Sequence, residues 1–210
     1  MIYNKTVSLQ TAEYLLGIKA VKLSPRDLFT WASGIKSPIY CDNRVTLSFP
    51  AIRTFIKENF VNAIAENFEK PDLIAGVATG GIPQGALVAE ELSLPFVYVR
   101  TSKKDHGLTN LIEGRVEPGQ RVVVVEDLIS TGSSSLEAVH ALKEAGCNVI
   151  GMVAIFTYNL PVAVSRFKEA GCKLITLTDY EFLIEKALKT NYINEDDLKI
   201  LQEFKTSLSK

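Results

Sequence analysis

The sequence has few cysteines, no excess of charge and no long apolar run, and each absence argues against a class of protein. Its three cysteines, Cys41, Cys147 and Cys172, are too widely spaced for a disulfide framework or a zinc signature, so we interpret them as reduced thiols. The formal net charge of −1 gives no support for bulk binding of nucleic acid or membrane, although a local anion site stays open. No apolar segment approaches the ~20 residues needed to cross a bilayer.

The beginning of the chain lacks the pattern of a secretory leader. Residues 1–22 mix Lys, Gln and Glu with apolar residues, without an uninterrupted apolar stretch. Together with the reduced thiols, this favours a cytoplasmic protein. With 210 residues, of which 47% are hydrophobic, the chain is long enough to bury a sizeable core, and we expect a single domain over residues 1–210.

Short apolar runs alternate with helical patterns between about residues 70 and 190. The predicted strands are short and mostly β-branched, as in a sheet covered on both faces; they are Leu73–Val77, Phe96–Val99, Val122–Val125, Val149–Ile155 and Leu174–Leu177. The predicted helices between them are Ile82–Leu92, Ser133–Ala145 and Pro161–Ala170. Gly146 and Gly171 follow two of these helices, where glycine is favoured. The alternation predicts an α/β fold with a central, mostly parallel five-stranded sheet flanked by helices.

The first 70 residues follow a different pattern. In chain order we expect a helix over Ser8–Lys19, extended pieces and turns over Val21–Asn43, and an amphipathic helix over Ser48–Phe68. Ser48 is the expected N-cap of the long helix, and Pro50 lies in its first turn. We therefore predict a small N-terminal lid of about residues 1–47 beside an α/β core of about 70–190. A last helix, about 195–208, is expected to pack on the outside.

The most informative stretch is VVVVEDLISTGSSS, residues 122–135. Four valines predict a buried strand, and Glu126 and Asp127 follow at its end. The loop behind them opens a helix, whose N–H groups and partial positive charge suit a phosphate. Gly132 allows close approach of the backbone, and hydroxyls add donors from Ser130, Thr131, Ser133 and Ser134.

The two acids of this stretch cannot contact a phosphate favourably. They must instead face ribose hydroxyls, a divalent cation or a developing positive charge. Simple helix capping is the alternative, but capping needs one hydroxyl residue and no pair of acids. A phosphate-loop NTPase and a dinucleotide-binding fold are excluded, since the sequence has neither Gly-Lys-Ser/Thr nor Gly-x-Gly-x-x-Gly.

Two further loops follow predicted strands. Ala78-Thr79-Gly80-Gly81 is either a second anion loop or a simple tight turn. If the strand order is flavodoxin-like, this loop and the loop after Asp127 flank the same topological switch point. The segment Arg100–Gly107 carries three cations and a histidine, and without further context it is either a solvated surface loop or part of a site. His140 falls within a predicted helix, and we interpret it as structural.

The stretch Glu126–Ser134 resembles the phosphoribosyl pyrophosphate motif of type I phosphoribosyltransferases, and the resemblance extends over the whole chain. It implies that Glu126 and Asp127 are catalytic and hold the ribose hydroxyls, and that the N-terminal lid is the small hood of that fold. The residues that the resemblance assigns to phosphoribosyl pyrophosphate are Arg100, Lys104, His106, Glu126, Asp127, Leu128, Ile129, Ser130, Thr131, Gly132, Ser133, Ser134, Thr79 and Gly80.

The hood pattern Ser33-Gly34-x-x-Ser37-Pro38-x-Tyr40 resembles orotate phosphoribosyltransferases of the Gram-positive-like branch. A β-turn at Ser33-Gly34 is expected as well. The resemblance implies transfer of the ribose 5-phosphate group to orotate, giving orotidine 5-monophosphate and pyrophosphate in de novo pyrimidine biosynthesis. The residues implied for orotate are Ser130, Lys36 and Tyr40, while candidates for its carboxylate are Lys36, Arg44 and backbone amides.

The segment after Arg100 resembles the mobile catalytic loop of the same enzymes, with Lys104 and His106 as catalytic residues. In that family the loop closes over the neighbouring subunit's site, which implies a homodimer. Thr101 stands where some members have lysine, so one cation is missing. Mg²⁺ is expected to arrive with the substrate diphosphate, so no all-protein metal site is predicted.

Two other functions remain open. A purine-type phosphoribosyltransferase would share the fold, but the hood pattern argues against it. A regulator that binds phosphoribosyl pyrophosphate and controls nucleotide synthesis would need a basic surface or an added winged helix, and the charge balance and length provide neither. A pure binder would also have no need of Lys104 and His106.

Overall fold

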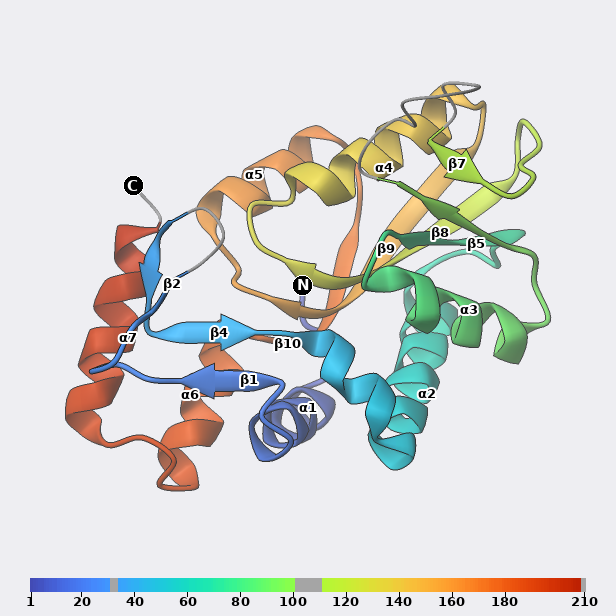
Figure 1. Cartoon of the computed structure of the whole chain (residues 1–210). Helices are drawn as coiled ribbons and strands as arrows, with labels where there is room; N and C mark the ends of the chain where they lie inside the picture. The colour runs from blue at the N-terminus through green and yellow to red at the C-terminus, as the bar shows by residue number, and fades with distance from the viewer. Residues whose placement is uncertain (31–33, 101–110, 209–210) are drawn as a thin grey trace.

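The computed structural model describes residues 1–30, 34–100 and 111–208. Its centre is a six-stranded sheet in the order β10-β9-β8-β5-β6-β7 (Figure 1). The strands are β5 Leu73–Val77, β6 Phe96–Val99, β7 Ile112–Glu113, β8 Arg121–Ile129, β9 Asn148–Thr157 and β10 Leu174–Asp179. The five predicted strands are all present and mutually parallel, and β5 pairs with β8 as the flavodoxin-like order requires. The short strand β7, which the sequence did not predict, pairs antiparallel with β6 at the edge.

Helices cover both faces of the sheet, because its central strands are apolar on both sides. The helices are α1 Lys5–Gly17, α2 Pro50–Asn67, α3 Gly81–Leu92, α4 Ser133–Glu144, α5 Pro161–Glu169, α6 Tyr180–Lys189 and α7 Glu195–Ser207. In β8, Val122 and Val124 belong to the apolar cluster under α4 and α5. Val123 and Val125 belong to the other cluster, formed with α1, α2 and α6. Alternate valines of this run therefore pack into the apolar clusters on opposite faces of the sheet. Figure 1 shows α4 and α5 together on one of these faces.

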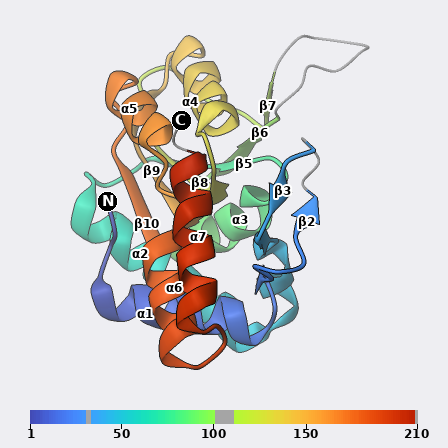
Figure 2. The same ribbon diagram turned by 90° about the vertical axis from the view of Figure 1, so that its left-hand side faces the viewer.

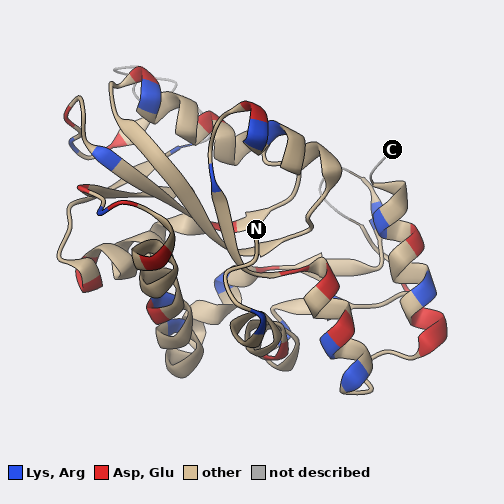
Figure 3. Ribbon diagram, turned by 180° about the vertical axis from the view of Figure 1, so that it is seen from behind, with Lys and Arg blue, Asp and Glu red and all other residues tan. Residues whose placement is uncertain are grey.

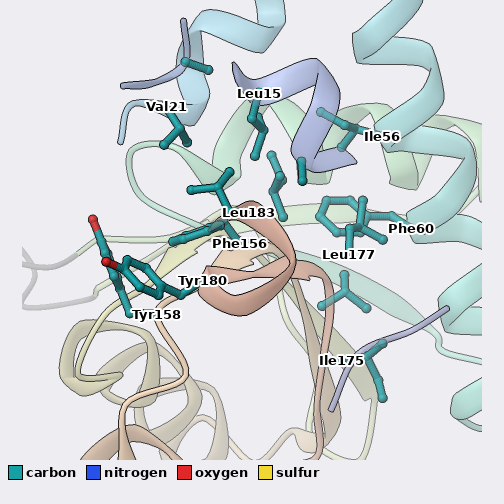
Figure 4. Close-up of a cluster of buried hydrophobic side chains, with 14 of the residues drawn as sticks. Leu15, Val21, Ile56, Phe60, Phe156, Tyr158, Ile175, Leu177, Tyr180 and Leu183 are labelled. Atoms are coloured by element: carbon teal, nitrogen blue, oxygen red, sulfur yellow. The ribbon is translucent and has the colours of Figure 1, made fainter. Parts of the chain in front are cut away.

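The larger of the two cores joins the sheet to the N-terminal and C-terminal helices. Figure 4 shows its side chains converging from several elements, with Phe60 of α2 near Leu177 of β10 and Phe156 near Tyr180. Phe156 and Tyr158 meet edge to face, with ring centroids 5.2 Å apart. Phe60 is fully buried, so its truncation to alanine would cost roughly 3–5 kcal/mol of stability.

The N-terminal part after α1 consists of short extended elements and a six-residue 3-10 helix. These are β1 Val21–Leu23, β2 Phe29–Thr30, β3 Lys36–Ser37, β4 Ile39–Cys41 and the 3-10 helix η1 Asn43–Ser48. β1 pairs antiparallel with β4, and β2 pairs antiparallel with β3. The predicted turn at Ser33-Gly34 falls partly outside the described residues, since Ser33 is among those the structure does not describe. Figure 2 shows the β2–β3 pair on the opposite side of the molecule from the N-terminus.

Two helices begin at positions that differ from the expectation, and one helix was not expected. The prediction that Ser48 caps the long helix is wrong: Ser48 ends η1, and α2 begins at Pro50 with Phe49 in the cap position and no side-chain cap. Helix α1 begins at Lys5, earlier than predicted, because the Asn4 side chain accepts from two backbone N–H groups of its first turn. Helix α6 was not predicted at all. Pro50 does lie in the first turn of α2, and Gly146 and Gly171 have positive φ of 85° and 59°, which confirms their expected positions after helices.

The first three residues extend the sheet beyond β10. Ile2 forms a parallel bridge with Thr176. The Thr176 N–H donates to the Met1 carbonyl at 3.0 Å, and the Tyr3 N–H donates to the Thr176 carbonyl at 2.9 Å. At the other end of the chain, α7 packs against α6, and Figure 3 shows basic and acidic positions interspersed along it. Within the described ranges no helix is long and apolar enough to cross a membrane.

Candidate functional site

The two predicted acids lie inside β8 rather than after it. β8 continues to Ile129, four residues past its expected end at Val125. The reason is that β9 pairs with β8 as far as Ile129, whereas β5 pairs with it only as far as Val125. From Glu126 onward, therefore, one edge of β8 has lost its β5 neighbour and faces the loop that follows β5. This is the switch point of the sheet, where open α/β sheets bind ligands.

The loop after β5 packs directly on the acid segment. A Cβ added to Gly80 would lie 2.2 Å from the Asp127 carboxyl carbon, and one added to Gly81 would lie 2.3 Å from the Val125 carbonyl oxygen. Only glycine allows the two segments to approach so closely. The Ala78–Thr79 peptide in this loop is cis. The structure thus brings the Thr79-Gly80-Gly81 loop and Asp127 into contact, as the predicted strand order required.

Glu126 is turned inward and has both carboxyl oxygens occupied. It is 5% exposed; its Oε1 accepts from the Asp127 N–H at 2.9 Å and its Oε2 from the Ser135 hydroxyl at 2.8 Å. Burial, reinforced by the neighbouring Asp127 carboxyl, raises the pKa of Glu126 well above its ordinary value. Glu126 therefore connects β8 to the first turn of α4, and Asp127 is the acid that reaches the glycine loop. Sequence reasoning missed Ser135, although it is the third serine of the predicted helix.

Asp127 is fixed from the N-terminal side by Asn43. The buried Asn43 side chain donates from Nδ2 to the Asp127 carbonyl at 2.6 Å, and its Oδ1 accepts from the Cys41 thiol at 3.4 Å. Burial, with the charges of nearby acids, raises the pKa of Cys41, which keeps it a neutral thiol donor. Burial also raises the pKa of Asp127, and the positive charge of Arg44 opposes that rise. Asn43 belonged to the predicted hood segment, but its link to the acid strand was not predicted.

The loop between β8 and α4 has the features of an anion cradle. Gly132 has φ of +78° and occupies the N-cap position of α4 without a side-chain cap, and the first turn of α4 contains no acid. A Cβ on Gly132 would lie 2.9 Å from the Phe167 ring of α5. The hydroxyls of Thr131 and Ser133 lie 3.3 Å apart at the loop. Uncapped N–H groups, close hydroxyls and the partial charge of a helix N-terminus suit a phosphate.

Helix α5 contributes a cation to this loop that sequence reasoning missed. Arg166 donates from Nη1 to the Thr131 carbonyl at 3.1 Å and to the Ser133 hydroxyl at 2.7 Å. It lies more than 30 positions along the chain from the loop it contacts. No local pattern distinguishes it from Lys168, the other cation of α5, so only the packing of the helix identifies it.

The remaining predicted residues divide between described and undescribed parts of the chain. Arg100 follows β6; its N–H donates to the Leu111 carbonyl at 2.9 Å, and its guanidinium lies 3.5 Å from a carboxyl oxygen of Glu113 on β7. Lys104 and His106, predicted as catalytic, lie outside the described residues. His140 lies in α4 and pairs with Glu144 four residues on, at 3.2 Å.

The hood candidates for the base are described except for residues 31–33. Lys36 donates to the Thr30 hydroxyl at 2.7 Å within the β2–β3 pair, and Tyr40 is half-exposed with its ring beside Phe29. Arg44 forms a bidentate pair with Asp42, at 2.7 and 2.9 Å. That pair holds the pKa of Asp42 below its usual range. Of these hood cations, Arg44 is the one whose charge acts on Asp127.

Comparison with known proteins agrees with this geometry. Residues 47–190 match the phosphoribosyl transferase domain family. The chain is 61% identical to orotate phosphoribosyltransferase of Phocaeicola vulgatus over 201 residues, which cover 96% of this chain and 95% of that protein. It is 56% identical to the enzyme of the same name from Streptococcus thermophilus over 200 residues, 95% of this chain and 96% of that one.

Solved structures give the same result at lower identity. The crystal structure of orotate phosphoribosyltransferase from Aeropyrum pernix is similar with a TM-score of 0.76 and 27% identity, over 87% of this chain and 99% of that chain. The type I fold, the sheet edge that carries Glu126 and Asp127, and relatives at about 60% identity over nearly the whole chain agree. The chain therefore belongs to the phosphoribosyltransferase family and, within it, to the orotate phosphoribosyltransferases of pyrimidine biosynthesis.

Proposed function

We propose that this chain transfers the ribose 5-phosphate group from phosphoribosyl pyrophosphate to orotate at the sheet edge where Asp127 meets Gly80. The observation that carries the proposal is the contact of the Asp127 carboxyl with the backbone of Gly80. It places a carboxylate between two loops suited to phosphate groups, at the switch point of the sheet. A sugar that carries a phosphate at one end and a diphosphate at the other fits this order of groups.

The two loops would hold the two ends of the substrate. The 5-phosphate would be bound by the loop from Leu128 to Ser134, through N–H groups of α4 and the hydroxyls of Thr131 and Ser133. The diphosphate would lie against Thr79 and Gly80. The ribose between them would face Asp127, while Glu126 keeps β8 and α4 in register through Ser135.

In the chemical step the bond from the anomeric carbon to the diphosphate oxygen breaks, and the electron pair leaves with pyrophosphate. The sugar becomes oxocarbenium-like, and a ring nitrogen of orotate forms the new bond to the same carbon. The ionised Asp127 carboxylate stabilises the developing positive charge, and the attraction is stronger than in bulk water because Asp127 is partly buried. Arg100, Lys104 and His106 neutralise the departing pyrophosphate, with His106 as proton donor.

A magnesium ion carried by the substrate fits the residues present. Asp127 offers hard oxygen ligands at the site, whereas both oxygens of Glu126 already accept hydrogen bonds inside the protein. Mg²⁺ keeps several waters and is commonly bound by one or two carboxylates plus substrate phosphates. Asp127 would hold the ion together with the diphosphate, and bound there Mg²⁺ would offset the negative charge of the leaving group.

Orotate would lie between the hood and the acid strand, with Ser130, Lys36 and Tyr40 as its contacts and Arg44 near its carboxylate. We propose that residues 1–210 form a single domain, with a hood of about 1–47, a core of about 70–190 and a C-terminal helix of about 195–208. The hydrogen bond from Asn43 to the Asp127 carbonyl connects the hood to the reacting centre.

The assay for this proposal follows the ultraviolet absorbance of orotate in the presence of phosphoribosyl pyrophosphate and Mg²⁺. Loss of orotate that requires both substrates is the expected result. Turnover of adenine, guanine or xanthine instead would contradict the assignment of orotate to the hood. Binding of phosphoribosyl pyrophosphate without turnover of any base would indicate a regulator.

The loop from Arg100 to Gly107 is proposed to serve the neighbouring subunit of a homodimer. Lys104→Ala should lower kcat by orders of magnitude without loss of folding, because it removes charge from the departing pyrophosphate. Mixing Lys104→Ala protein with a variant inactive in the 130–134 loop should restore activity in mixed dimers, since one site then has both parts intact. Mixed dimers without activity would contradict the shared site.

A further inference from the structure

Arg166 of α5 lies at the loop proposed to bind the 5-phosphate, yet nothing in the family motif includes it. We propose that Arg166 binds the 5-phosphate of phosphoribosyl pyrophosphate and of orotidine 5-monophosphate, and supplies the positive charge that the loop itself lacks. This rests on the proposed function of the 128–134 loop. In addition to the loop, the phosphate would then have a charged partner that comes from a separate helix, α5.

The loop provides hydrogen-bond donors but no charged group. Residues 128–135 read LISTGSSS, without lysine or arginine. A phosphate monoester carries close to two negative charges at neutral pH. Backbone N–H groups and hydroxyls can bind it, but arginine matches phosphate in both charge and shape.

Helix α5 is packed so that its arginine must lie at this loop. The Phe167 ring and the Ala163 side chain lie against Gly132, at 2.9 and 3.9 Å from where a Cβ would stand. Arg166 precedes Phe167 and donates from a single nitrogen, Nη1, to both Thr131 and Ser133. A guanidinium has five N–H donors, and over the described ranges the others of Arg166 have no protein partner.

The electrostatic setting of Arg166 favours an anion beside it. Ser133 is the first residue of α4, so the guanidinium lies at the positive end of that helix, where a cation is disfavoured. The first turn of α4 has no acid, and Arg166 forms no ion pair in the part of the chain that the structure describes. The negative charge of a phosphate bound in the loop would balance the partial positive charge of the α4 N-terminus and the positive charge of the guanidinium.

The test compares Arg166→Gln with Lys168→Gln, a matched loss of one positive charge on the same exposed helix. Affinity is measured for orotidine 5-monophosphate and for orotidine, which lacks the phosphate. We expect Arg166→Gln to bind the nucleotide roughly 30-fold more weakly, the size expected for a hydrogen bond between charged groups, and to bind orotidine normally. Lys168→Gln should match the wild type for both ligands. In turnover, KM for phosphoribosyl pyrophosphate should rise more than kcat falls.

A second measurement tests whether Arg166 acts on the phosphate through its charge or only holds the loop in its conformation. Wild-type affinity for the nucleotide should rise with pH as its phosphate gains a second charge near pH ~6. Arg166→Gln should flatten that rise, whereas Arg166→Lys, which keeps the charge, should retain most of it. An unchanged pH dependence in Arg166→Gln would overturn the inference. If the wild type itself binds the nucleotide no better than orotidine, the proposed phosphate loop is wrong, and not merely the role of Arg166.

Discussion

Gly80→Ala tests the contact on which the proposed mechanism depends. The backbone at Gly80 has φ of −68° and ψ of −32°, which alanine adopts without strain. The new Cβ would nevertheless lie 2.2 Å from the Asp127 carboxyl carbon and 2.2 and 2.5 Å from its two oxygens. The substitution therefore acts on the Asp127 side chain rather than on the local backbone.

The size of the effect follows from the overlap. Ordinary van der Waals contact begins at 3.4 Å, so the Asp127 carboxyl must move by about 1 Å. A displacement of that size at a reacting group can lower the rate about 100-fold, equivalent to roughly 2.7 kcal/mol in the activation free energy. The free energy of unfolding should change little, because the end of the Asp127 side chain can rotate away.

The assay is kcat for orotate consumption, with urea unfolding measured in parallel. Gly17→Ala is the control, since a Cβ there meets nothing within 4 Å. Gly81→Ala is a useful contrast: its Cβ would meet the Val125 carbonyl oxygen at 2.3 Å, so the backbone itself must move and stability should fall. A Gly80→Ala enzyme with wild-type kcat would refute the role given to Asp127.

Three further predictions concern single polar groups. Asp127→Asn should lower kcat by orders of magnitude. Burial raises the pKa of Asp127 in the folded protein, so the ionised carboxylate destabilises the fold at neutral pH. The variant should therefore resist urea better than wild type at pH 7 and lose that advantage as pH falls toward 4. Asn43→Ala should lower the free energy of unfolding by about 1–3 kcal/mol, because the Asp127 carbonyl loses its buried donor. Asp72→Asn should destabilise the protein at pH 7, because hydrogen bonds from Arg121 hold the Asp72 pKa below its ordinary value and the ionised carboxylate stabilises the fold. The difference from wild type should shrink progressively as pH falls below the unfolded pKa of about 4 toward the lower folded pKa, and a difference that does not change with pH would contradict the Asp72–Arg121 pair.

The strands of the core were predictable because they are buried on both faces, and burial on both faces leaves a run of β-branched residues. The ends of these strands were harder to predict from the sequence. Glu126 and Asp127 have the polar character of a loop, yet they lie in β8 because β9 continues to pair with it. Strand β7 has two residues and no pattern of its own. Helix α6 could have been found, since Asp179 caps it and its apolar residues recur at helical spacing.

The candidate site was predictable where its residues are contiguous in the chain. The acid pair, the hydroxyl loop and the Thr79-Gly80 loop each form a local pattern, and the parallel sheet brings them to one edge. Two of the residues that were missed act across long separations in sequence. Asn43 contacts Asp127 from the N-terminal part of the chain, and Arg166 reaches its loop from another helix. No local pattern records such pairs, because they exist only once the helices have packed.

The pairing of residues 1–3 with Thr176 has a consequence for synthesis of the chain. Residues 1–3 have their hydrogen-bond partners in β10, at Thr176, so this segment is synthesised long before the strand with which it pairs. Such non-local pairing slows folding and leaves an edge strand exposed meanwhile. Residues 1–3 therefore stay unpaired until the chain has been synthesised as far as β10, and during that time they are open to other binding partners of extended backbone.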